Sequence, residues 1–581
     1  MKEWVLLEEP DPSLVQKIER GLDLPPVVAK LIAQRGFDVE GARRFLHPSL
    51  EELHDPFLLK DMELAVDRIL LAIRRGEKIF IYGDYDVDGT TGTALLLRSI
   101  KELGGDCEFY IPHRLREGYG LSQEGIREIH ERGARVVITV DCGVTAYEEV
   151  KFARDLVLDV IVTDHHELRS ASGGLPHALA ILNPKQRGDP YPYKDLAGCG
   201  IAFKLAEGLF HRIGRDPKGV YRHLDLVALA TVADIVSLTG ENRIYSRYGM
   251  QALEKTEKPG LRALLTVCGI GKIEINSYHI GFILGPRINA MGRLASAEDT
   301  IRLLTTKDEE EGMELAKRLD KENRLRREIE EKILEEALKE VEGMDLSKKK
   351  GIVLARQGWH EGVIGIVASR LVEKYHRPTI LIALDGDRGK GSGRSIVGFH
   401  LFNALLQCGE ELITFGGHEG ACGLTLHVEQ VESFQRKFEE VAISEISDEA
   451  LKPRIFIDSE IRFREIDKSL FLALKGMEPF GPKNPRPLFL LREVEVVGHP
   501  GIVGDGHLKF RIREEGHVLS VMGYGLASYL PAIQDRRHRI SLVFSLNENE
   551  FLEGRREDPT KVPPLLIAKD MKVEDSNSSQ Q

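Results

Sequence analysis

Residues 79 to 92 read Ile-Phe-Ile-Tyr-Gly-Asp-Tyr-Asp-Val-Asp-Gly-Thr-Thr-Gly, and this stretch constrains the fold more than any other. The apolar run Ile79 to Tyr82 predicts a buried strand. A helix is expected to begin soon afterwards, with Thr90 or Thr91 as its N-cap. Between them stand three aspartates at alternate positions: Asp84, Asp86 and Asp88. Such closely spaced carboxylates repel one another unless a cation lies among them. A polar turn is the alternative, because Asp and Gly are common in turns.

The bulk composition is that of a globular protein with several domains. The chain has 581 residues, 42% hydrophobic and 30% charged, and this length predicts about three or four domains. It has no run of about 18 apolar residues, and its first residues do not follow the pattern of a signal peptide. Six scattered cysteines without a C-x-x-C pair argue against a zinc ribbon or a disulfide framework. We therefore expect a cytoplasmic protein without a membrane span.

The net charge of −12 counts mildly against a nucleic-acid binder, because strong binders are often basic overall. A local basic groove can nevertheless lie within an acidic total. Charge alone therefore leaves this class of function open.

Strand, loop and helix alternate from Lys78 onward, and this alternation predicts a parallel sheet covered by helices. Predicted strands occupy 79–82, 107–111, 135–140 and 159–162, with predicted helices at 122–132 and 145–154 between them. In open sheets of this kind, ligands bind at the carboxyl ends of the strands.

The carboxyl ends of three predicted strands carry acidic residues or histidines. The first is followed by Asp84 and Asp86, the third by Asp141, and the fourth by Asp164-His165-His166-Glu167. Singly, Asp141 could be a helix cap and the histidines a surface loop. Together they predict a metal site, since imidazole beside carboxylates suits a transition metal. Asp234 interrupts a predicted apolar helix at 224–238, and a buried carboxylate needs a partner such as a metal.

Three later stretches carry basic residues or glycines that suit phosphate. Gly285–Arg293 is predicted as a loop whose two arginines match phosphate oxygens. Gly389–Ser395 and Phe415–Gly423 are predicted as glycine-rich loops that let the backbone approach an anion. Each of these stretches could also be an ordinary loop.

The pattern divides the chain into six predicted segments. They are a helical lead-in at 1–77, a catalytic α/β domain at 78–304, a connector helix at 305–347, a second α/β domain at 348–449, a β-rich domain at 450–570 resembling an OB-fold, and a disordered tail at 571–581. The five predicted short strands of the β-rich domain begin with Arg454–Asp458.

The ordered motifs resemble those of the DHH phosphoesterase superfamily and, more narrowly, the RecJ family of bacterial single-stranded-DNA exonucleases. The superfamily motifs are Asp84-Tyr-Asp86-Val-Asp88-Gly89, Asp141-Cys-Gly, Asp164-His165-His166 and Asp234, with Gly416-Gly417-His418-x-x-Ala421-x-Gly423 resembling the associated domain. The narrower resemblance rests on Pro286–Arg293, Trp359–Arg370 and Pro479–Pro485. It covers nearly the whole chain.

The resemblance implies a fold of two α/β lobes joined by a long helix: a parallel-sheet catalytic lobe, a smaller DHH-associated lobe, and a C-terminal OB-fold-like β-barrel. It also implies 5′-to-3′ degradation of single-stranded DNA to mononucleotides in repair and recombination. The implied cofactor is Mn²⁺ or Mg²⁺ in a two-metal site. Carboxylates with one imidazole suit Mn²⁺ somewhat better than Mg²⁺.

The family's site residues carry over to matching positions of this chain. The implied metal ligands are Asp84, Asp86, Asp141, His165 and Asp234, with Asp141 bridging two ions. His166 would contact the scissile phosphate. The implied phosphate- and DNA-binding residues are Arg114, His166, Arg287, Asn289, Ser392, Arg394 and His418. Asp88 is interpreted instead as a residue that stabilises the turn.

One position departs from the superfamily pattern. Several members have a histidine metal ligand shortly before the first aspartate, whereas this chain has Tyr82 there. We therefore expect the first metal to bind weakly, or only when substrate is present. The expected partners are single-stranded DNA, a single-strand-binding protein and a helicase, and the expected state is a monomer.

Two alternative functions remain at this stage. One is a DHH phosphodiesterase of small substrates such as nanoRNA, cyclic dinucleotides or polyphosphate, which the extra barrel and the length argue against. The other is a non-catalytic DNA-binding scaffold, which the intact motifs argue against.

Overall fold

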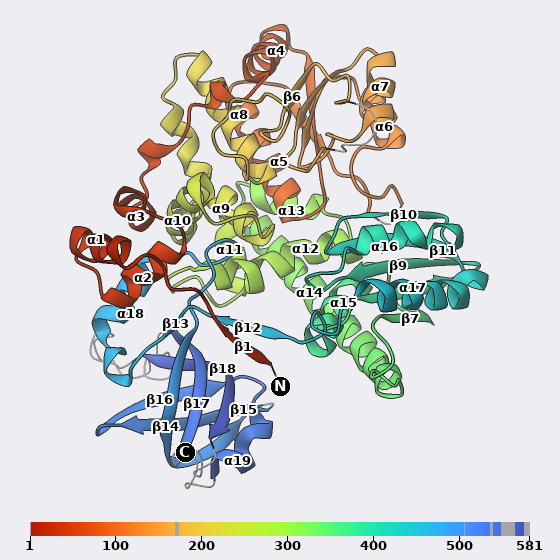
Figure 1. The fold of residues 1–581 in the computed structure, drawn as a ribbon. Coiled ribbons are helices and arrows are strands. Elements are labelled where there is room, and N and C mark those ends of the chain that lie inside the picture. Colours follow the sequence, from red (N-terminus) through yellow and green to blue (C-terminus); the bar gives the residue numbers. More distant parts are fainter. Residues whose placement is uncertain are drawn as a thin grey trace. The chain divides into compact units, whose positions relative to one another are not determined.

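The computed structural model describes residues 2–114, 116–168, 174–504, 506–534, 539–547 and 564–574 (Figure 1). These residues form two compact units. One comprises Leu53–Lys452, and the other combines Met1–Glu52 with Pro453–Gln581. Each unit is described by itself below.

A five-stranded sheet in the order β3-β2-β4-β5-β6 is the centre of the first lobe of Leu53–Lys452. Its strands are β2 (Lys78–Gly83), β3 (Cys107–Tyr110), β4 (Ala134–Val140), β5 (Asp159–Thr163) and β6 (Ala180–Leu182). Every neighbouring pair is parallel, which confirms the predicted sheet. Consequently, all the carboxyl ends lie along one edge.

The sequence of the central strand explains its place in the sheet. In β4, Ala-Arg-Val-Val-Ile-Thr-Val, all residues except Arg135 are buried, as expected for a β-branched strand covered on both faces. Helices α6 (Gln123–Glu131) and α7 (Tyr147–Asp155) supply part of one hydrophobic cluster with Phe80 and Val137. Helices α4 (Met62–Arg75), α5 (Val87–Glu102) and α8 (Gly198–Arg212) also pack against strands of this sheet.

A group of helices follows the sheet in the sequence. They are α9 (Leu224–Ala233), α10 (Gly240–Glu254), α11 (Pro259–Val267), a π-helical turn (His279–Leu284), α12 (Gly285–Leu294) and α13 (Glu298–Thr305). The prediction of a loop at Gly285–Arg293 is wrong, because this stretch is helix α12. Pro286 is compatible with it, since proline is tolerated in the first helical turn.

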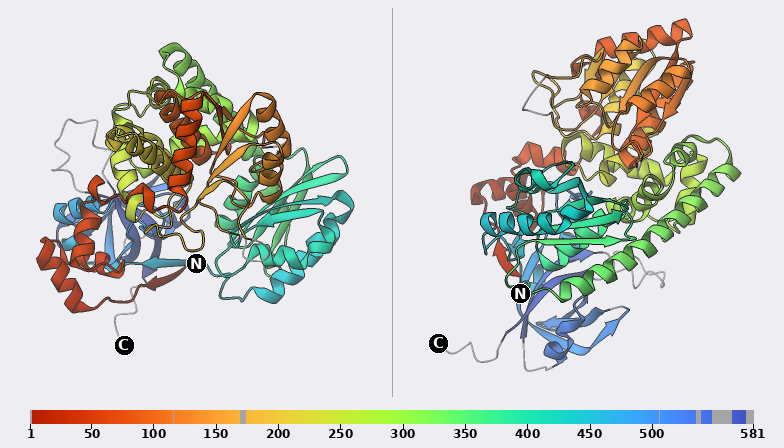
Figure 2. Two further views of the ribbon diagram at one scale, coloured as in Figure 1. Left: turned by 90° about the horizontal axis from the view of Figure 1, so that it is seen from above. Right: turned by 90° about the vertical axis from the view of Figure 1, so that its right-hand side faces the viewer.

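The long helix α14 (Glu309–Glu342) connects the two lobes and confirms the predicted connector (Figure 2). The Asp308 carboxylate accepts a hydrogen bond from the Glu311 backbone N–H at 2.8 Å, which caps the helix. Glu309, Glu310 and Glu311 occupy its first turn, where negative charge is favourable to the helix dipole.

The second lobe has a mixed sheet in the order β10-β11-β9-β8-β7. Its elements are β7 (Ile352–Gln357), α15 (Ile364–Tyr375), β8 (Thr379–Asp385), β9 (Arg388–Arg394), α16 (Leu401–Gln407), β10 (Thr414–Gly417), β11 (Ala421–His427) and α17 (Val431–Glu445). The two predicted glycine-rich loops are therefore largely strands. A Cβ atom at Gly391 would lie 2.6 Å from Leu424 Cδ1, so this glycine serves close packing.

The other compact unit joins the two ends of the described chain. Strand β1 (Glu3–Leu6) pairs in parallel with β12 (Arg454–Ile457). The N-terminal helices α1 (Pro12–Leu22), α2 (Pro26–Gln34) and α3 (Val39–Leu46) share a hydrophobic core with α18 (Lys468–Gly476) and the barrel strands. Residues 2–52 therefore belong with the C-terminal part, and 53–77 belong with the catalytic lobe.

The predicted β-barrel is present, with a different set of strands. Its strands are β14 (Phe489–Val503), β15 (His507–Glu514), β16 (His517–Gly523), β17 (Arg539–Asn547) and β18 (Leu565–Glu574), and pairing of β14 with β17 closes it. Strand β13 (Ser459–Glu460) extends β14, and α19 (Leu530–Gln534) follows β16. The predicted first barrel strand, Arg454–Asp458, instead forms β12.

Strand β18 also changes the predicted C-terminal tail. It continues through residues 571–574, so the predicted disordered tail at 571–581 is wrong for these residues. Residues 575–581 lie outside the described residues. Among the helices that the structure describes, none combines the length and apolar character needed to cross a bilayer.

Candidate metal and phosphate site

The first aspartates lie in a tightly packed turn between β2 and α5. Helix α5 begins at Val87 with Asp86 as its N-cap, and the Gly89 N–H donates to the Asp86 carboxylate at 3.0 Å. The predicted caps Thr90 and Thr91 are wrong. Their hydroxyls lie inside the helix and donate to the carbonyls of Asp86 and Val87 respectively. A Cβ atom at Gly89 would lie 2.5 Å from the Asp84 carbonyl oxygen, so glycine permits the turn.

Asp88 ties α5 to α8. Its two carboxylate oxygens accept hydrogen bonds from the backbone N–H groups of Gly198 and Cys199, each at 2.6 Å. A buried carboxylate is favourable at a helix N-terminus. These contacts agree with the interpretation of Asp88 as a stabilising residue, and they hold the N-terminus of α8 beside Asp141.

Asp141 lies at the centre of the candidate site. It follows β4 in a left-handed conformation with φ of 62°, and a Cβ atom at Gly198 would lie 2.8 Å from Asp141 Cβ. Asp141 belongs to two groups with the spacing of metal ligands, one with Asp84 and Asp86 and one with His165 and His166. It can therefore bridge two cations.

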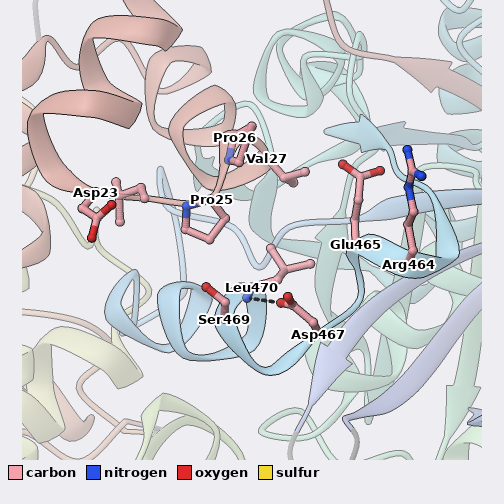
Figure 3. A pocket seen from close by; sticks show the side chains of 10 residues that line it. Asp23, Pro25, Pro26, Val27, Arg464, Glu465, Asp467, Ser469 and Leu470 are labelled. Carbon is pink, nitrogen blue, oxygen red and sulfur yellow. Dashed lines mark hydrogen bonds between the residues drawn. The ribbon is translucent and has the colours of Figure 1, made fainter.

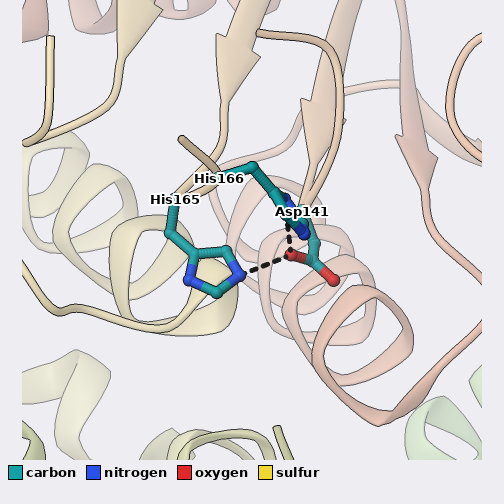
Figure 4. A group of neighbouring side chains, drawn as sticks. All are labelled: Asp141, His165 and His166. Atoms are coloured by element: carbon teal, nitrogen blue, oxygen red, sulfur yellow. Dashed lines mark ion pairs between the residues drawn. The ribbon is translucent and has the colours of Figure 1, made fainter. Parts of the chain in front are cut away.

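The two histidines after β5 point toward Asp141 (Figure 4). His165 Nε2 lies 3.1 Å from Asp141 Oδ1. The neighbouring His166 is more exposed, and its Nδ1 lies 2.8 Å from Asp164 Oδ1. Asp164 also accepts hydrogen bonds from the backbone N–H groups of Val144 and His166. Asp164 therefore holds the His166 ring in place.

Asp234 joins the same site from the end of a helix. The predicted helix at 224–238 is too long, because α9 ends at Ala233 and the next residues turn away. Asp234 Oδ2 lies 3.5 Å from His165 Nε2, and Asp234 forms a third candidate metal group with Asp88 and His165. Ending the helix at this point directs the carboxylate toward the histidine.

The electrostatics of this cluster fit a cation. Burial and the neighbouring carboxylates raise the pKa values of Asp84 and Asp141 well above the ordinary range and that of Asp234 to about 9. Burial lowers the pKa of His165 to about 3. Three buried atoms of the cluster lack a hydrogen-bond partner among the described residues: Asp84 Oδ1, Asp141 Oδ1 and His165 Nε2. Unpaired buried groups are costly, and divalent cations would satisfy them.

Tyr82 does not take the place of the histidine found in several superfamily members. Its hydroxyl accepts a hydrogen bond from the Ser122 N–H at 3.2 Å, and its ring lies 5.0 Å from that of Tyr110. The side chain is part of the hydrophobic cluster under α6. It is absent from the candidate metal groups found among the described residues.

A cavity of about 250 Å³ opens beside the carboxylates. It is lined by Asp84, Tyr85, Asp86, Arg114, Tyr119, Asn289 and Arg293. The Arg114 guanidinium lies 4.8 Å from the centre of the Tyr85 ring, within the range of a cation–π contact. The cavity therefore has acidic and basic side chains around one space.

Arg114 and Arg293 form the basic side of this cavity, and two further arginines act electrostatically on Arg293. Burial, followed by the positive charges of Arg114, Arg326 and Arg394, lowers the pKa of Arg293 to about 10. Arg293 Nη1 donates to the Gly362 carbonyl at 2.9 Å, just before α15. Accumulated positive charge of this kind is relieved by an anion.

Ser392 and Arg394 approach the same region from β9. Being two residues apart on a strand, they share a face, and Arg394 Nη1 lies 3.3 Å from Ser392 Oγ. A Cβ atom at Gly365 in the first turn of α15 would lie 2.7 Å from Ser392 Oγ. Both side chains therefore lie against the N-terminus of α15, where anions are favoured.

The remaining predicted DNA-binding residues lie in different settings. Asn289 lines the cavity, and its Oδ1 accepts a hydrogen bond from the Val87 N–H at 3.1 Å. Arg287 does not line it; its Nε donates to Asp320 Oδ1 at 2.9 Å and joins α12 to α14. His418 lies in the exposed turn between β10 and β11, where Nδ1 accepts from the Gly420 N–H.

Sequence reasoning missed several residues of the site. Arg293 is predicted only as one of two arginines suited to phosphate and is not among the predicted site residues. Tyr119 donates a hydrogen bond to the Asp141 carbonyl at 2.8 Å, and its hydroxyl lies 3.1 Å from His166 Nδ1. The motif that contains Asp164 does not indicate that this residue orients His166. Of these three residues, only Arg293 could be connected with phosphate binding from the sequence, because a guanidinium group matches phosphate oxygens.

A larger cavity of about 550 Å³ lies in the other compact unit (Figure 3). Its lining includes Pro25 and Pro26, together with acidic Asp23, Glu465 and Asp467 and the single cation Arg464. Asp467 is occupied in part as the cap of α18, accepting from the Leu470 N–H at 2.8 Å. This acidic lining is unsuited to a phosphate backbone.

Acidic and imidazole groups at the carboxyl edge of a parallel sheet, facing a basic cavity, define a metal-dependent phosphoesterase. Family models match accordingly: "DHH family, N-terminal domain" at residues 78–231, "DHHA1 domain" at 348–444 and "RecJ OB domain" at 457–557.

Relatives that match most of this chain agree. The single-stranded-DNA-specific exonuclease RecJ of Bacillus subtilis is 39% identical over 98% of this chain and 70% of its own length. That of Escherichia coli is 35% identical over 92% of this chain and 94% of its own. The crystal structure of Thermus thermophilus RecJ in complex with Mn²⁺ aligns with a TM-score of 0.83 at 29% identity, covering 99% of this chain and 80% of that one. The chain belongs to the RecJ family.

Proposed function

We propose that this protein is a single-stranded-DNA-specific exonuclease that degrades DNA from the 5′ end and releases mononucleotides, acting in repair and recombination. The observation that carries the proposal is the composition of one cavity. Asp84 and Asp86 lie on its acidic side, and Arg114 and Arg293 lie on its basic side. Family membership supports the same activity.

The proposed metal ligands are Asp84, Asp86, Asp141, His165 and Asp234, with Asp141 shared between two cations. Bound Mn²⁺ or Mg²⁺ would supply an activated water and stabilise charge on the phosphate. Related crystal structures are of T. thermophilus RecJ in complex with Mn²⁺ and with Mg²⁺. Because Tyr82 is engaged with Ser122, the metal held by Asp84 and Asp86 is proposed to bind more weakly.

His166 is the proposed contact to the scissile phosphate. Burial alone would lower the pKa of its imidazole, but the hydrogen bond that the ring donates to Asp164, together with the charge of that carboxylate, outweighs this and raises the pKa above its ordinary value. A protonated ring can donate a hydrogen bond to a phosphate oxygen. His166 is exposed, and its Nδ1 lies 3.1 Å from the hydroxyl of Tyr119, which lines the cavity.

The arginine end of the cavity is the proposed site of the 5′-terminal phosphate. Arg114, Arg293, Ser392 and Arg394 would hold it, supported by the N-terminus of α15. An enzyme that binds the terminal phosphate acts only at a chain end, and the bond one nucleotide further on is then presented to the metals. Asn289, Arg287 and His418 remain the proposed contacts along the strand.

Binding to DNA is proposed to depend strongly on salt. The chain has a net charge of −12, so attraction for DNA comes from local basic residues whose phosphate contacts release counterions. A single-strand-binding protein and a helicase are the proposed partners, and a monomer is the proposed state.

The test is a timed digestion of end-labelled single-stranded DNA with Mn²⁺, Mg²⁺ or chelator. We expect metal-dependent release of mononucleotides from the 5′ end and little activity on duplex DNA. Preference for dinucleotides over long DNA would instead indicate a phosphodiesterase of small substrates. Binding without hydrolysis under every metal condition would indicate a scaffold.

A further inference from the structure

Strand β9 presents a polar face beside the proposed site of the terminal phosphate. Its sequence, Arg-Gly-Lys-Gly-Ser-Gly-Arg over Arg388–Arg394, alternates glycine with a polar residue. The glycines face the apolar core of the second lobe. At Gly393, for example, a Cβ atom would lie 2.6 Å from the Cys422 sulfur. Side chains alternate along a strand, so the four polar residues share the opposite face.

This polar face has an order relative to the arginines. Burial, and to a lesser extent the positive charge of Arg114, lowers the pKa of Arg394, and Arg114 lines the cavity. Ser392 comes next along the strand, and Lys390 follows about 7 Å beyond Ser392 at the usual rise of a strand. The polar face therefore leads from the arginine end of the cavity, past Ser392, to Lys390.

An ion pair closes this polar face one step beyond Ser392. Lys390 Nζ lies 2.7 Å from Glu361 Oε2, and Glu361 belongs to the loop just before α15. Ser392 contacts the first turn of the same helix, as the 2.7 Å between its Oγ and a Cβ atom at Gly365 indicates. The Glu361–Lys390 ion pair therefore joins β9 to the loop before α15.

The same loop contacts the arginine end of the cavity. Glu361 is adjacent to Gly362, whose carbonyl accepts the hydrogen bond from Arg293 Nη1 at 2.9 Å. The side chains of Lys390 and Glu361 are 52% and 29% exposed, and ion pairs as exposed as this add little to stability. Its position beside Arg293 and Ser392 thus distinguishes this ion pair from an ordinary surface pair.

We propose that Glu361, held by Lys390, limits the terminal site to one phosphate and makes the enzyme selective for 5′-monophosphate over 5′-triphosphate ends. This inference rests on the proposed function. The second and third phosphates of a triphosphate end would continue along β9 from Ser392 and meet the Glu361 carboxylate, and like charges brought together are costly. Lys390 offers no compensation, because Glu361 already binds its ammonium group.

The two kinds of end give different first products. Attack of water on the first internal phosphodiester breaks the bond between phosphorus and the 3′ oxygen of the first nucleotide. The hydroxyl of the water stays on phosphorus, which becomes the 5′ phosphate of the shortened strand, and the 3′ oxygen takes up a proton. A monophosphate end therefore releases a nucleoside monophosphate, and a triphosphate end releases a nucleoside triphosphate.

The test compares the parent with Glu361→Gln and Lys390→Gln on single-stranded DNA of one sequence, with a 5′-monophosphate or a 5′-triphosphate end and a label in the first nucleoside. The first product is separated by chromatography after digestion with Mn²⁺. The measured quantity is the ratio of kcat/KM for triphosphate ends to that for monophosphate ends.

We expect a ratio of about 0.1 or less for the parent and a rise of roughly tenfold for Glu361→Gln, which removes the repulsion and frees Lys390 to bind phosphate. Lys390→Gln should lower the ratio further, because it leaves the Glu361 carboxylate without its cation. Both substitutions break the same ion pair, so a purely structural role would move the ratio in one direction only. Glu335→Gln breaks a pair with Lys339 of the same 2.7 Å length on α14 and should keep the parent's ratio.

The outcomes separate the two proposals. If the parent digests monophosphate ends but accepts triphosphate ends equally well, or if the two variants move the ratio in the same direction or not at all, this inference is overturned and the proposed function stands. Release of pyrophosphate before the first nucleoside monophosphate would place the triphosphate at the metals and would also overturn it. If the parent digests neither kind of strand, both proposals fall.

Discussion

His165 Nε2 and Asp141 Oδ1 lie 3.1 Å apart in the interior, and neither atom has a hydrogen-bond partner among the described residues. An imidazole nitrogen and a carboxylate oxygen at this distance would ordinarily share a proton. Burial, however, disfavours the charged histidine. A cation between the two atoms would satisfy both of them. The surrounding carboxylates supply negative charge that such a cation would balance.

Asp141→Asn should abolish activity and yet stabilise the metal-free protein. Asn retains the left-handed backbone conformation of this position but removes one charge from a cluster of buried carboxylates. We expect kcat to fall at least about 1,000-fold, since metal ions contribute several kcal/mol to such reactions. In chelator, the unfolding temperature should exceed that of the parent. If the variant digested DNA at the parent's rate, Asp141 would not be a metal ligand.

Metal binding should raise the unfolding temperature, and the size of this effect should depend on the imidazole of His165. The parent should be stabilised by Mn²⁺ in proportion to the logarithm of its concentration above the dissociation constant. His165→Ala should weaken Mn²⁺ binding more than Mg²⁺ binding, because imidazole is a better ligand for transition metals. Titration calorimetry with each ion measures this, and equal losses for both ions would contradict the role of His165. His427→Ala, at an exposed position of β11, is the control.

Asp164→Ala should lower kcat with little change in KM. Asp164 holds His166 through a hydrogen bond of 2.8 Å, and loss of such an orienting carboxylate typically costs about 10- to 100-fold. Asp164→Asn keeps one oxygen acceptor and should recover part of the rate. A parallel loss of DNA affinity, or no recovery in Asp164→Asn, would indicate a structural role only.

Arg293→Ala should reduce the preference for a 5′-phosphorylated end. Hydrogen bonds to charged groups contribute about 1.5–3 kcal/mol, so the ratio of kcat/KM for 5′-phosphate over 5′-hydroxyl strands should fall roughly 10- to 100-fold. Arg293→Lys should be intermediate, because lysine keeps the charge without the planar fork. If the ratio is unchanged, the terminal phosphate binds elsewhere.

His223 should make the protein less stable in mild acid. The residue is buried, neither ring nitrogen has a hydrogen-bond partner among the described residues, and burial with nearby Lys258 and Arg222 lowers its pKa to about 2. The unfolded residue binds a proton near pH 6.5 and the folded one does not. Stability is therefore fully present above pH 6.5 and is lost as the pH falls below it.

His223→Leu tests this directly. Between pH 7 and pH 5, the parent should lose about 2 kcal/mol more of its free energy of unfolding than the variant, the cost of one proton bound only by the unfolded chain. Denaturant unfolding at several pH values measures the difference. Equal pH dependence in the two proteins would show that the buried ring is protonated in the folded state.

Much of the fold could be predicted because it depends on local pattern. The alternation of strands and helices predicted the parallel sheet, and the 34-residue helix α14 has a charged, helix-forming sequence. The errors have local causes as well. Gly389–Ser395 contains glycines typical of a loop, but the structure uses them for close packing of β9 against Leu424. Similarly, β1 pairs with β12 across most of the chain, and nothing near Glu3 indicates such a distant partner.

The sequence by itself determined which chemistry gathers at the site. Asp84, Asp141 and His165 each follow a strand, and parallel strands in one sheet bring their carboxyl ends to one edge. Tertiary structure alone decided the direction of each side chain and the partners from distant segments. Helix α9 ends one residue before Asp234, Tyr82 turns to Ser122, and Arg293 reaches Gly362. These outcomes follow from how helices pack across the whole lobe, which residue spacing does not encode.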